Sequence, residues 1–139
     1  MKKIVIFLMT ICIAFVAVLP TYAFNDQEII PYYNNAYSVN PQFVINDNGE
    51  ITIKISFEGK AGVCTGASVD VQLQKNRFGL WSNVVDGEWH DNLIGEDGSV
   101  TYETRVYLKG EYRIVYDIVV LGSGGSADVI SGTIEQTYQ

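Results

Sequence analysis

The sequence predicts an all-β protein, an antiparallel β-sandwich of about seven strands. Apolar and polar residues alternate with a period of two over most of the chain beyond residue 40, and this is the period of strands that bury one face. Turn-forming residues separate the alternating runs. Beyond residue 23, no stretch carries the i, i+3, i+4, i+7 apolar spacing of an amphipathic helix over three turns. Short strands joined by turns favour a sandwich over a helical fold.

Residues 1–23 are predicted to be a helical signal peptide. Two lysines precede the apolar run of residues 4–19, and the small residues Thr21 and Ala23 suit a signal-peptidase site. The run is shorter than the ~20 residues that a membrane helix needs. We therefore expect cleavage after Ala23 and a secreted or extracellular protein. The alternative is an uncleaved membrane anchor that keeps the protein at the cell surface.

The remaining residues, 24–139, have the size of a single domain. The formal net charge of the whole chain is −7. An acidic surface repels phosphate backbones and anionic lipids, so the composition argues against nucleic-acid binding. For the same reason, membrane contact is expected only through the signal segment, if it is not cleaved.

The first half of this domain is predicted to begin irregularly and then form strands. Residues 24–40 read as a lead-in whose later part forms an edge strand. Apolar residues 43–45 precede the turn sequence Asn-Asp-Asn-Gly at 46–49. Residues 51–57 and 69–74 then alternate between apolar and polar side chains, as half-buried strands do.

The second half is predicted to contain the most apolar strand. Residues 100–108 alternate, and residues 112–120 are apolar on one face and mixed on the other, which is typical of a central strand. Residues 122–126 are glycines and serines and form a flexible connection. Residues 129–138 form a weaker closing strand in which Gly132 marks a bulge or kink.

The segment Gly110-Glu111-Tyr112, at the entrance to the most apolar strand, resembles the tyrosine corner of immunoglobulin-like sandwiches. In that motif the tyrosine hydroxyl bonds back to the backbone a few residues upstream. The resemblance implies an immunoglobulin-like topology, with Gly110 and Tyr112 as structural residues. Immunoglobulin domains pair two cysteines and bury a tryptophan, whereas aliphatic residues such as Ile55 and Ile114 stand at the corresponding positions here. We therefore expect an immunoglobulin-like topology but do not expect the chain to belong to the immunoglobulin family.

A second resemblance covers most of the chain after residue 30. Its motifs are Pro31-Tyr32-Tyr33, Leu73-Gln74-Lys75, Gly79-x-Trp81, Val84, Trp89 and Lys109-Gly110-Glu111-Tyr112-Arg113. In this order the motifs are similar to those of small secreted proteins of Gram-positive, Clostridia-type bacteria, a domain of unknown function. The resemblance implies secretion and this fold. It brings no catalytic residues.

Cys64 is the only cysteine left after cleavage, so an intrachain disulfide is not expected. We expect Cys64 to act as a small buried apolar residue. The alternative is a free thiol that pairs between chains or captures a ligand.

His90 is the only histidine, and neither it nor its neighbours predict a reaction centre. Strand alternation would put Glu88 and His90 on one face and Asp91 on the other, which does not suit a metal site of three or four ligands. We therefore expect no metal, no cofactor and no catalytic residue. The alternative hypothesis is a small secreted hydrolase or thiol-dependent enzyme that uses Cys64 or His90.

Aromatic residues are the best candidates for binding. Exposed tryptophan and tyrosine rings stack on sugars and anchor protein interfaces, although large aromatic side chains also fill cores. The candidates are Trp89, Trp81, Tyr32, Tyr33 and Tyr37. The sequence thus favours a non-catalytic recognition or adhesion module at the cell envelope, with a protein or a glycan as its partner.

Overall fold

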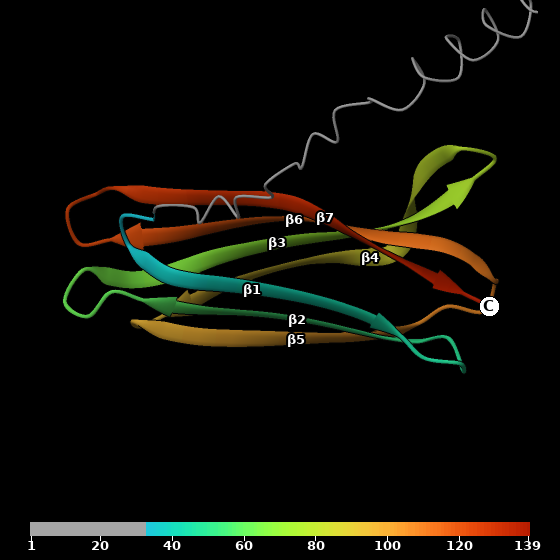
Figure 1. Ribbon diagram of the computed structural model, residues 1–139, viewed down its shortest axis with the longest axis horizontal. Helices are drawn as coiled ribbons and strands as arrows, with labels where there is room; N and C mark the ends of the chain where they lie inside the picture. The colour runs from blue at the N-terminus through green and yellow to red at the C-terminus, as the bar shows by residue number, and fades with distance from the viewer. Residues whose placement is uncertain (1–32) are drawn as a thin grey trace, which may run out of the picture. The chain divides into compact units, whose positions relative to one another are not determined.

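The computed structural model describes residues 33–139, which form two facing antiparallel sheets and contain no helix (Figure 1). The strands are β1 (Ala36–Ile45), β2 (Glu50–Gly59), β3 (Cys64–Arg77), β4 (Leu80–Ile94), β5 (Asp97–Arg105), β6 (Gly110–Gly122) and β7 (Ala127–Tyr138). The predicted seven-stranded sandwich is confirmed. The predicted signal peptide and Tyr32 lie outside the described residues. Within 33–139, no helix has the length and hydropathy of a membrane span.

One sheet has the strand order β1-β2-β5 and the other the order β4-β3-β6-β7. The chain therefore changes sheets after β2, after β4 and after β5. In constant-type immunoglobulin domains the fourth strand lies beside the fifth. Here β4 pairs with β3 instead, from Gly66↔Ile94 to Arg77↔Leu80. As a result β4 and β5 are the free edges of different sheets.

The core lies between the sheets and follows the alternation of the sequence. Ile51, Ile53 and Ile55 of β2 face inward, and their neighbours Thr52 and Lys54 are exposed. The other fully buried aliphatic residues come from the two central strands of the larger sheet: Val69, Val71, Leu73, Ile114, Ile118 and Val120. Branched side chains pack well on a pleated surface, so these residues favour strands and fill the core together.

The tyrosine corner is present where β6 begins. The hydroxyl of Tyr112 donates a hydrogen bond to the carbonyl oxygen of Leu108 at 2.5 Å, as the resemblance implied. Lys75 donates to the same carbonyl at 3.2 Å, and its ammonium lies 5.1 Å from the centre of the Tyr112 ring. The corner therefore ties β3, β6 and the β5–β6 loop together. Gly110 has a φ of 134°, a conformation that favours glycine.

Replacing Tyr112 with phenylalanine should lower the free energy of unfolding by about 1 kcal/mol, because a buried hydrogen bond is lost. The loss stays modest because Lys75 still satisfies the Leu108 carbonyl. For a domain of this size we expect the melting temperature to fall by about 4 °C. Calorimetry of the wild type and the variant measures this, and an unchanged melting temperature would mean that the bond does not stabilise the corner.

Two expectations about strands were wrong. The strand predicted over 100–108 ends at Arg105, and Leu108 is exposed in the following loop. Gly132 is not at a bulge, because it pairs with Tyr116 in the continuous register of β6 and β7. A Cβ atom at Gly132 would lie 2.4 Å from the Tyr116 hydroxyl oxygen. A side chain at this position would therefore displace the Tyr116 ring, which lies over the glycine.

The N-terminal edge is held by a buried aspartate. The carboxylate of Asp128 accepts hydrogen bonds from the backbone N–H groups of Asn34, Asn35 and Ala36 at 2.9, 2.6 and 3.1 Å. The Asn35 amide in turn donates to the carbonyl of Val120 at 3.1 Å. These bonds fasten the lead-in to β6 and β7 before β1 begins. The expected edge strand is confirmed as β1, at the free edge of the smaller sheet.

An irregular bulge of several residues divides β4 into two halves. Gln72 pairs with Glu88 and Gln74 pairs with Asn83, so β4 carries extra residues opposite Leu73. Asp86 in the bulge has a φ of 57°, a left-handed conformation that is uncommon outside glycine. The bulge breaks the alternation, and side chains on its two sides do not keep a common face.

Candidate functional site

The bulge places the two tryptophans in different surroundings. Trp89 packs on the core and stacks on Tyr102, with ring centres 5.4 Å apart and ring planes at 18°. Trp81 lies beneath the guanidinium of Arg113, which is 4.4 Å from the ring centre. The Nε atom of Arg113 donates to Gln74, on the outward face of β3. Both rings are partly covered, one from within the sandwich and one on its outer surface.

The remaining aromatic candidates do not join the tryptophans. Tyr33 is partly buried, and its carbonyl accepts from Lys60 at 2.5 Å, near the start of β3. Tyr37 is exposed on the edge strand β1. Trp81 lies near the other end of β3, opposite Asn76. The structure therefore does not gather the described aromatic candidates into one binding patch.

Cys64 and His90 are far apart. Cys64 begins β3 opposite Gly122, whereas His90 lies opposite Asp70, six residues further along β3. That spacing corresponds to about 20 Å at 3.4 Å per residue. Cys64 is 5% exposed, as expected of a small buried apolar residue. A thiol–imidazole dyad would need hydrogen-bond contact, which this separation prevents.

His90 belongs to a polar row across the outer face of the larger sheet. Its Nδ1 atom lies 2.7 Å from the carboxylate of Asp70. Asp70 stands opposite Asp117 in the register of β3 and β6, and the Ser131 hydroxyl donates a hydrogen bond to Asp117. His90 and Ser131 are three strand spacings apart, about 14 Å. A serine nucleophile and its base must touch, so this row does not form a catalytic triad. No group of three ligands that could hold a metal ion is found among residues 33–139.

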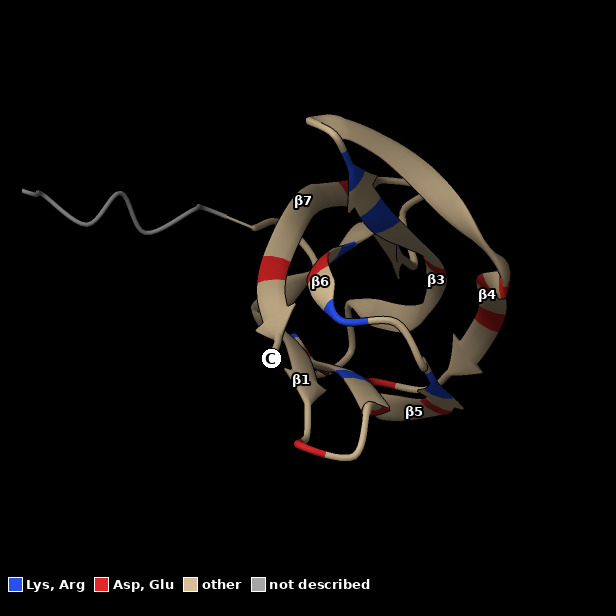
Figure 2. Ribbon diagram, turned by 90° about the vertical axis from the view of Figure 1, so that its right-hand side faces the viewer, with Lys and Arg blue, Asp and Glu red and all other residues tan. Residues whose placement is uncertain are grey.

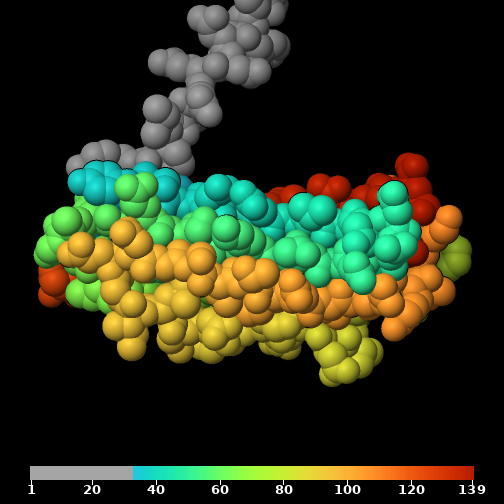
Figure 3. Space-filling view, turned by 90° about the horizontal axis from the view of Figure 1, so that it is seen from below, coloured from blue at the N-terminus to red at the C-terminus, as the bar shows by residue number. Residues whose placement is uncertain are grey.

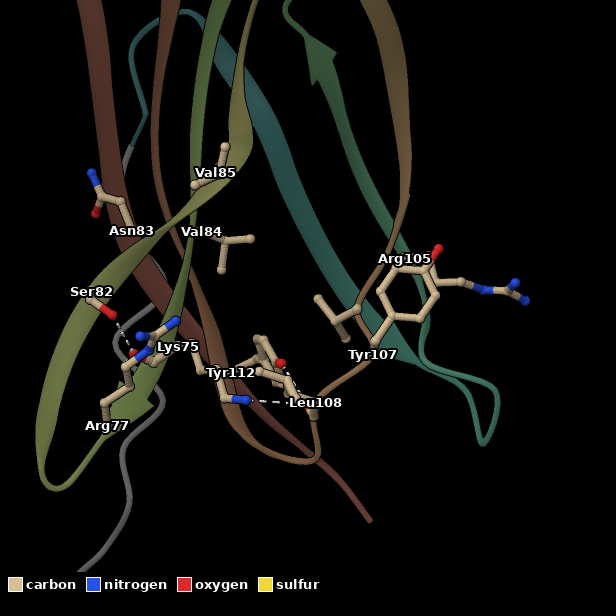
Figure 4. A pocket seen from close by; sticks show the side chains of 11 residues that line it. Lys75, Arg77, Ser82, Asn83, Val84, Val85, Arg105, Tyr107, Leu108 and Tyr112 are labelled. Carbon is tan, nitrogen blue, oxygen red and sulfur yellow. Dashed lines mark hydrogen bonds between the residues drawn. The ribbon is translucent and has the colours of Figure 1, made fainter.

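A groove of about 280 Å³ lies where β3, β4 and the β5–β6 loop meet at one end of the sandwich (Figure 4). We call it the end groove. Figure 3 shows the yellow residues of β4 beside orange β5 and projecting from the body near one end. The residues that line it are Lys75, Arg77, Ser82, Asn83, Val84, Val85, Arg105, Val106, Tyr107, Leu108 and Tyr112.

The end groove has an apolar floor and an exposed apolar rim. Val106 and Tyr112 are buried, and they belong to the core that continues beneath the groove. Val85, Tyr107 and Leu108 line the same groove and are all exposed. Val85 lies in the bulge of β4, next to Asp86, and a bulge redirects side chains from the regular alternation. Exposed apolar side chains around a groove are typical of interaction sites.

The charges that line the end groove are all positive. Lys75 and Arg77 extend from β3, while Arg105 extends away from the floor and pairs with Glu50 at 2.7 Å (Figure 4). No aspartate or glutamate lines the groove in the part of the chain that the structure describes. Figure 2 looks at this end of the sandwich, where basic segments of several strands and loops come into view. An acidic protein thus presents a basic groove.

The hairpin beside the groove ends in a strained aromatic residue. Phe78 and Gly79 have φ values of 55° and 84°, the pattern of a type I′ turn between Arg77 and Leu80. Glycine and asparagine suit such a turn, whereas a bulky residue with positive φ is an outlier. The Phe78 side chain is fully exposed.

No protein-family model matches the chain, and no curated protein matches it significantly. The site must therefore be judged from its own residues. Sequence reasoning missed the end groove because its lining comes from β3, β4 and the β5–β6 loop, whose residues lie far apart in the sequence. The one local signal was the run Tyr107-Leu108-Lys109 after a strand, which alternation alone assigns to the strand itself.

Proposed function

We propose that the chain is an exported, non-catalytic recognition module that binds a protein or glycan partner at the cell envelope through the end groove. The observation that carries this proposal is the combination of an apolar floor, an exposed apolar rim and cationic side chains in one groove. Loops and strand edges held by a rigid sandwich are common binding sites. We also propose, from the sequence motifs, that the chain is related to the small secreted proteins of Clostridia-type bacteria.

A binding experiment with envelope components tests this function. The chain starting at Phe24 is immobilised beside a groove variant, Arg77→Glu with Tyr107→Ser, and a control variant, Val44→Ser with Val129→Ser. The control removes two exposed apolar side chains that do not line the groove. We expect the wild type and the control to retain the same component and the groove variant to lose at least tenfold in binding. Equal binding by all three, or retention by none, contradicts the proposal.

A further inference from the structure

The chain itself contains a segment that complements the end groove. Residues 24–32 read Phe-Asn-Asp-Gln-Glu-Ile-Ile-Pro-Tyr, with two acidic residues and no basic one. The acidic residues, Asp26 and Glu28, lie within three residues before the apolar pair Ile29 and Ile30. Acidic side chains suit the positive lining of the groove, and aliphatic side chains suit its floor of Val84, Val106 and Tyr112.

Ile29 does not reach the end of the groove at Tyr112 in its own molecule. Asn35 is bonded to the carbonyl of Val120, at one end of β6, whereas Tyr112 at the groove lies at the other end of that strand. Eight residues of strand separate Tyr112 from Val120, which is about 27 Å. Ile29 is six residues before Asn35 and extends at most about 22 Å from it. A second copy can bring these residues to the floor of the groove without this restriction.

We propose that the end groove binds residues 26–30 of a second copy of this chain. This inference rests on the proposed function of the groove as a recognition surface and names an occupant for it. Ile29 or Ile30 packs on the apolar floor, and the carboxylates of Asp26 and Glu28 lie near Lys75 and Arg77. An extended segment also suits this place because β4 and β5 each present a free strand edge to it.

Such a contact joins unlike surfaces of two copies, the leading segment of one and the groove of the next. Reciprocal exchange of the segments closes a symmetric dimer, whereas exchange in one direction builds rings or open chains. The charged part of the contact is screened by salt, so association should weaken as ionic strength rises. A secreted chain with this property would assemble head to tail outside the cell.

A charge-exchange experiment tests the inference. The tail variant carries Asp26→Lys and Glu28→Lys. A second groove variant, different from the one used in the envelope binding experiment, carries Arg77→Glu and Val85→Glu. Sedimentation velocity is measured for chains starting at Phe24, since residues Tyr32–Gln139 form a compact unit by themselves. The wild type should self-associate, and each variant alone should associate at least tenfold more weakly. Because each variant offers the surface that the other needs, an equimolar mixture should associate again.

Two controls keep the outcomes distinct. Lys54→Glu, an exposed reversal on β2 away from the groove, should associate like the wild type. A synthetic peptide of residues 24–32 should dissociate wild-type assemblies, and a scrambled peptide of the same composition should not. A wild type that stays monomeric, or a mixture that does not recover, overturns the inference. The envelope binding experiment has a different readout, so the recognition function can hold when this inference fails.

Discussion

Replacing Asp128 with alanine should lower the free energy of unfolding by about 3–5 kcal/mol. Asp128 is only 7% exposed, and its carboxylate is the acceptor for three consecutive backbone N–H groups, from Asn34 to Ala36. Alanine leaves these donors at a partly or fully buried position, and each unsatisfied buried donor costs about 1–3 kcal/mol. Domains of this size are stable by about 5–15 kcal/mol, so the variant should be close to unfolding. Urea denaturation followed by tryptophan fluorescence measures the loss.

Asp128→Asn is the matched control. The asparagine keeps the shape of the side chain and one oxygen acceptor, but it loses the charge and the second acceptor. We expect a loss of about half that of the alanine variant, because charged acceptors make stronger hydrogen bonds than neutral ones. If the alanine variant unfolds at the same urea concentration as the wild type, the three hydrogen bonds do not hold the N-terminal edge.

The same carboxylate should make stability depend on pH. Burial by itself raises the pKa of Asp128, but the three backbone N–H groups and the charge of Lys60 outweigh it and hold that pKa below 3.8. The unfolded chain has the ordinary value and takes up the proton first as pH falls. The contribution of Asp128 is therefore complete above about pH 5 and is lost as pH falls through the folded pKa. Urea midpoints measured between pH 6 and pH 3 should fall more for the wild type than for Asp128→Asn.

The strands that could be predicted from sequence are those that bury one face against the other sheet and leave the opposite face exposed. In β2, every second residue from Ile51 to Phe57 is buried, so the alternation in the sequence reports the structure directly. Tyr112 could be assigned because its corner is local, with a bond to a carbonyl four residues upstream. Interactions between residues close to one another in the chain produce local sequence patterns that can be recognised without a structure.

The residues that escaped prediction depend on partners distant in the chain. Asp128 lies at the start of a weak strand, and its burial is decided by N–H groups more than 90 residues earlier. Which face of the sheet each of Trp81 and Trp89 occupies depends on how many residues the bulge at Asp86 inserts into β4. The Asp-Gly pair in the sequence indicates a turn but does not specify that number. The end groove likewise depends on β4 lying in the sheet of β3, and strand alternation carries no information about which sheet a strand joins.

Replacing Trp89 with alanine should destabilise the domain by about 3 kcal/mol. The sequence alone predicts a different outcome, in which this variant folds normally and loses only partner binding. The ring of Trp89 packs on the core and stacks on Tyr102, and a stacked aromatic pair contributes about 0.5–1.5 kcal/mol beyond the area that it buries. Removing the ring also leaves a cavity that an edge strand can close only in part. Thermal denaturation followed by circular dichroism measures the change.

The position of Tyr102 adds to this effect. Burial, and then the neighbouring carboxylate of Asp91, raise the pKa of Tyr102, whose hydroxyl is buried. Trp89 supplies part of the packing around Tyr102. We expect Trp89→Phe to recover more than half of the lost stability, because phenylalanine still offers a ring to stack on Tyr102.

Trp81→Ala provides the contrast within the same strand. Its ring lies on the outer face beneath Arg113, and an exposed cation–π contact is worth about 0.5–1 kcal/mol. The order of stability should be wild type, then Trp81→Ala, then Trp89→Ala. The reverse order of the two variants would place Trp81 in the core. Because Trp89 points between the sheets, its loss should also loosen the packing of β4 against β5. Both strands lead to the end groove. Weaker partner binding by Trp89→Ala would then result from lost packing and not from the loss of a direct contact with the partner.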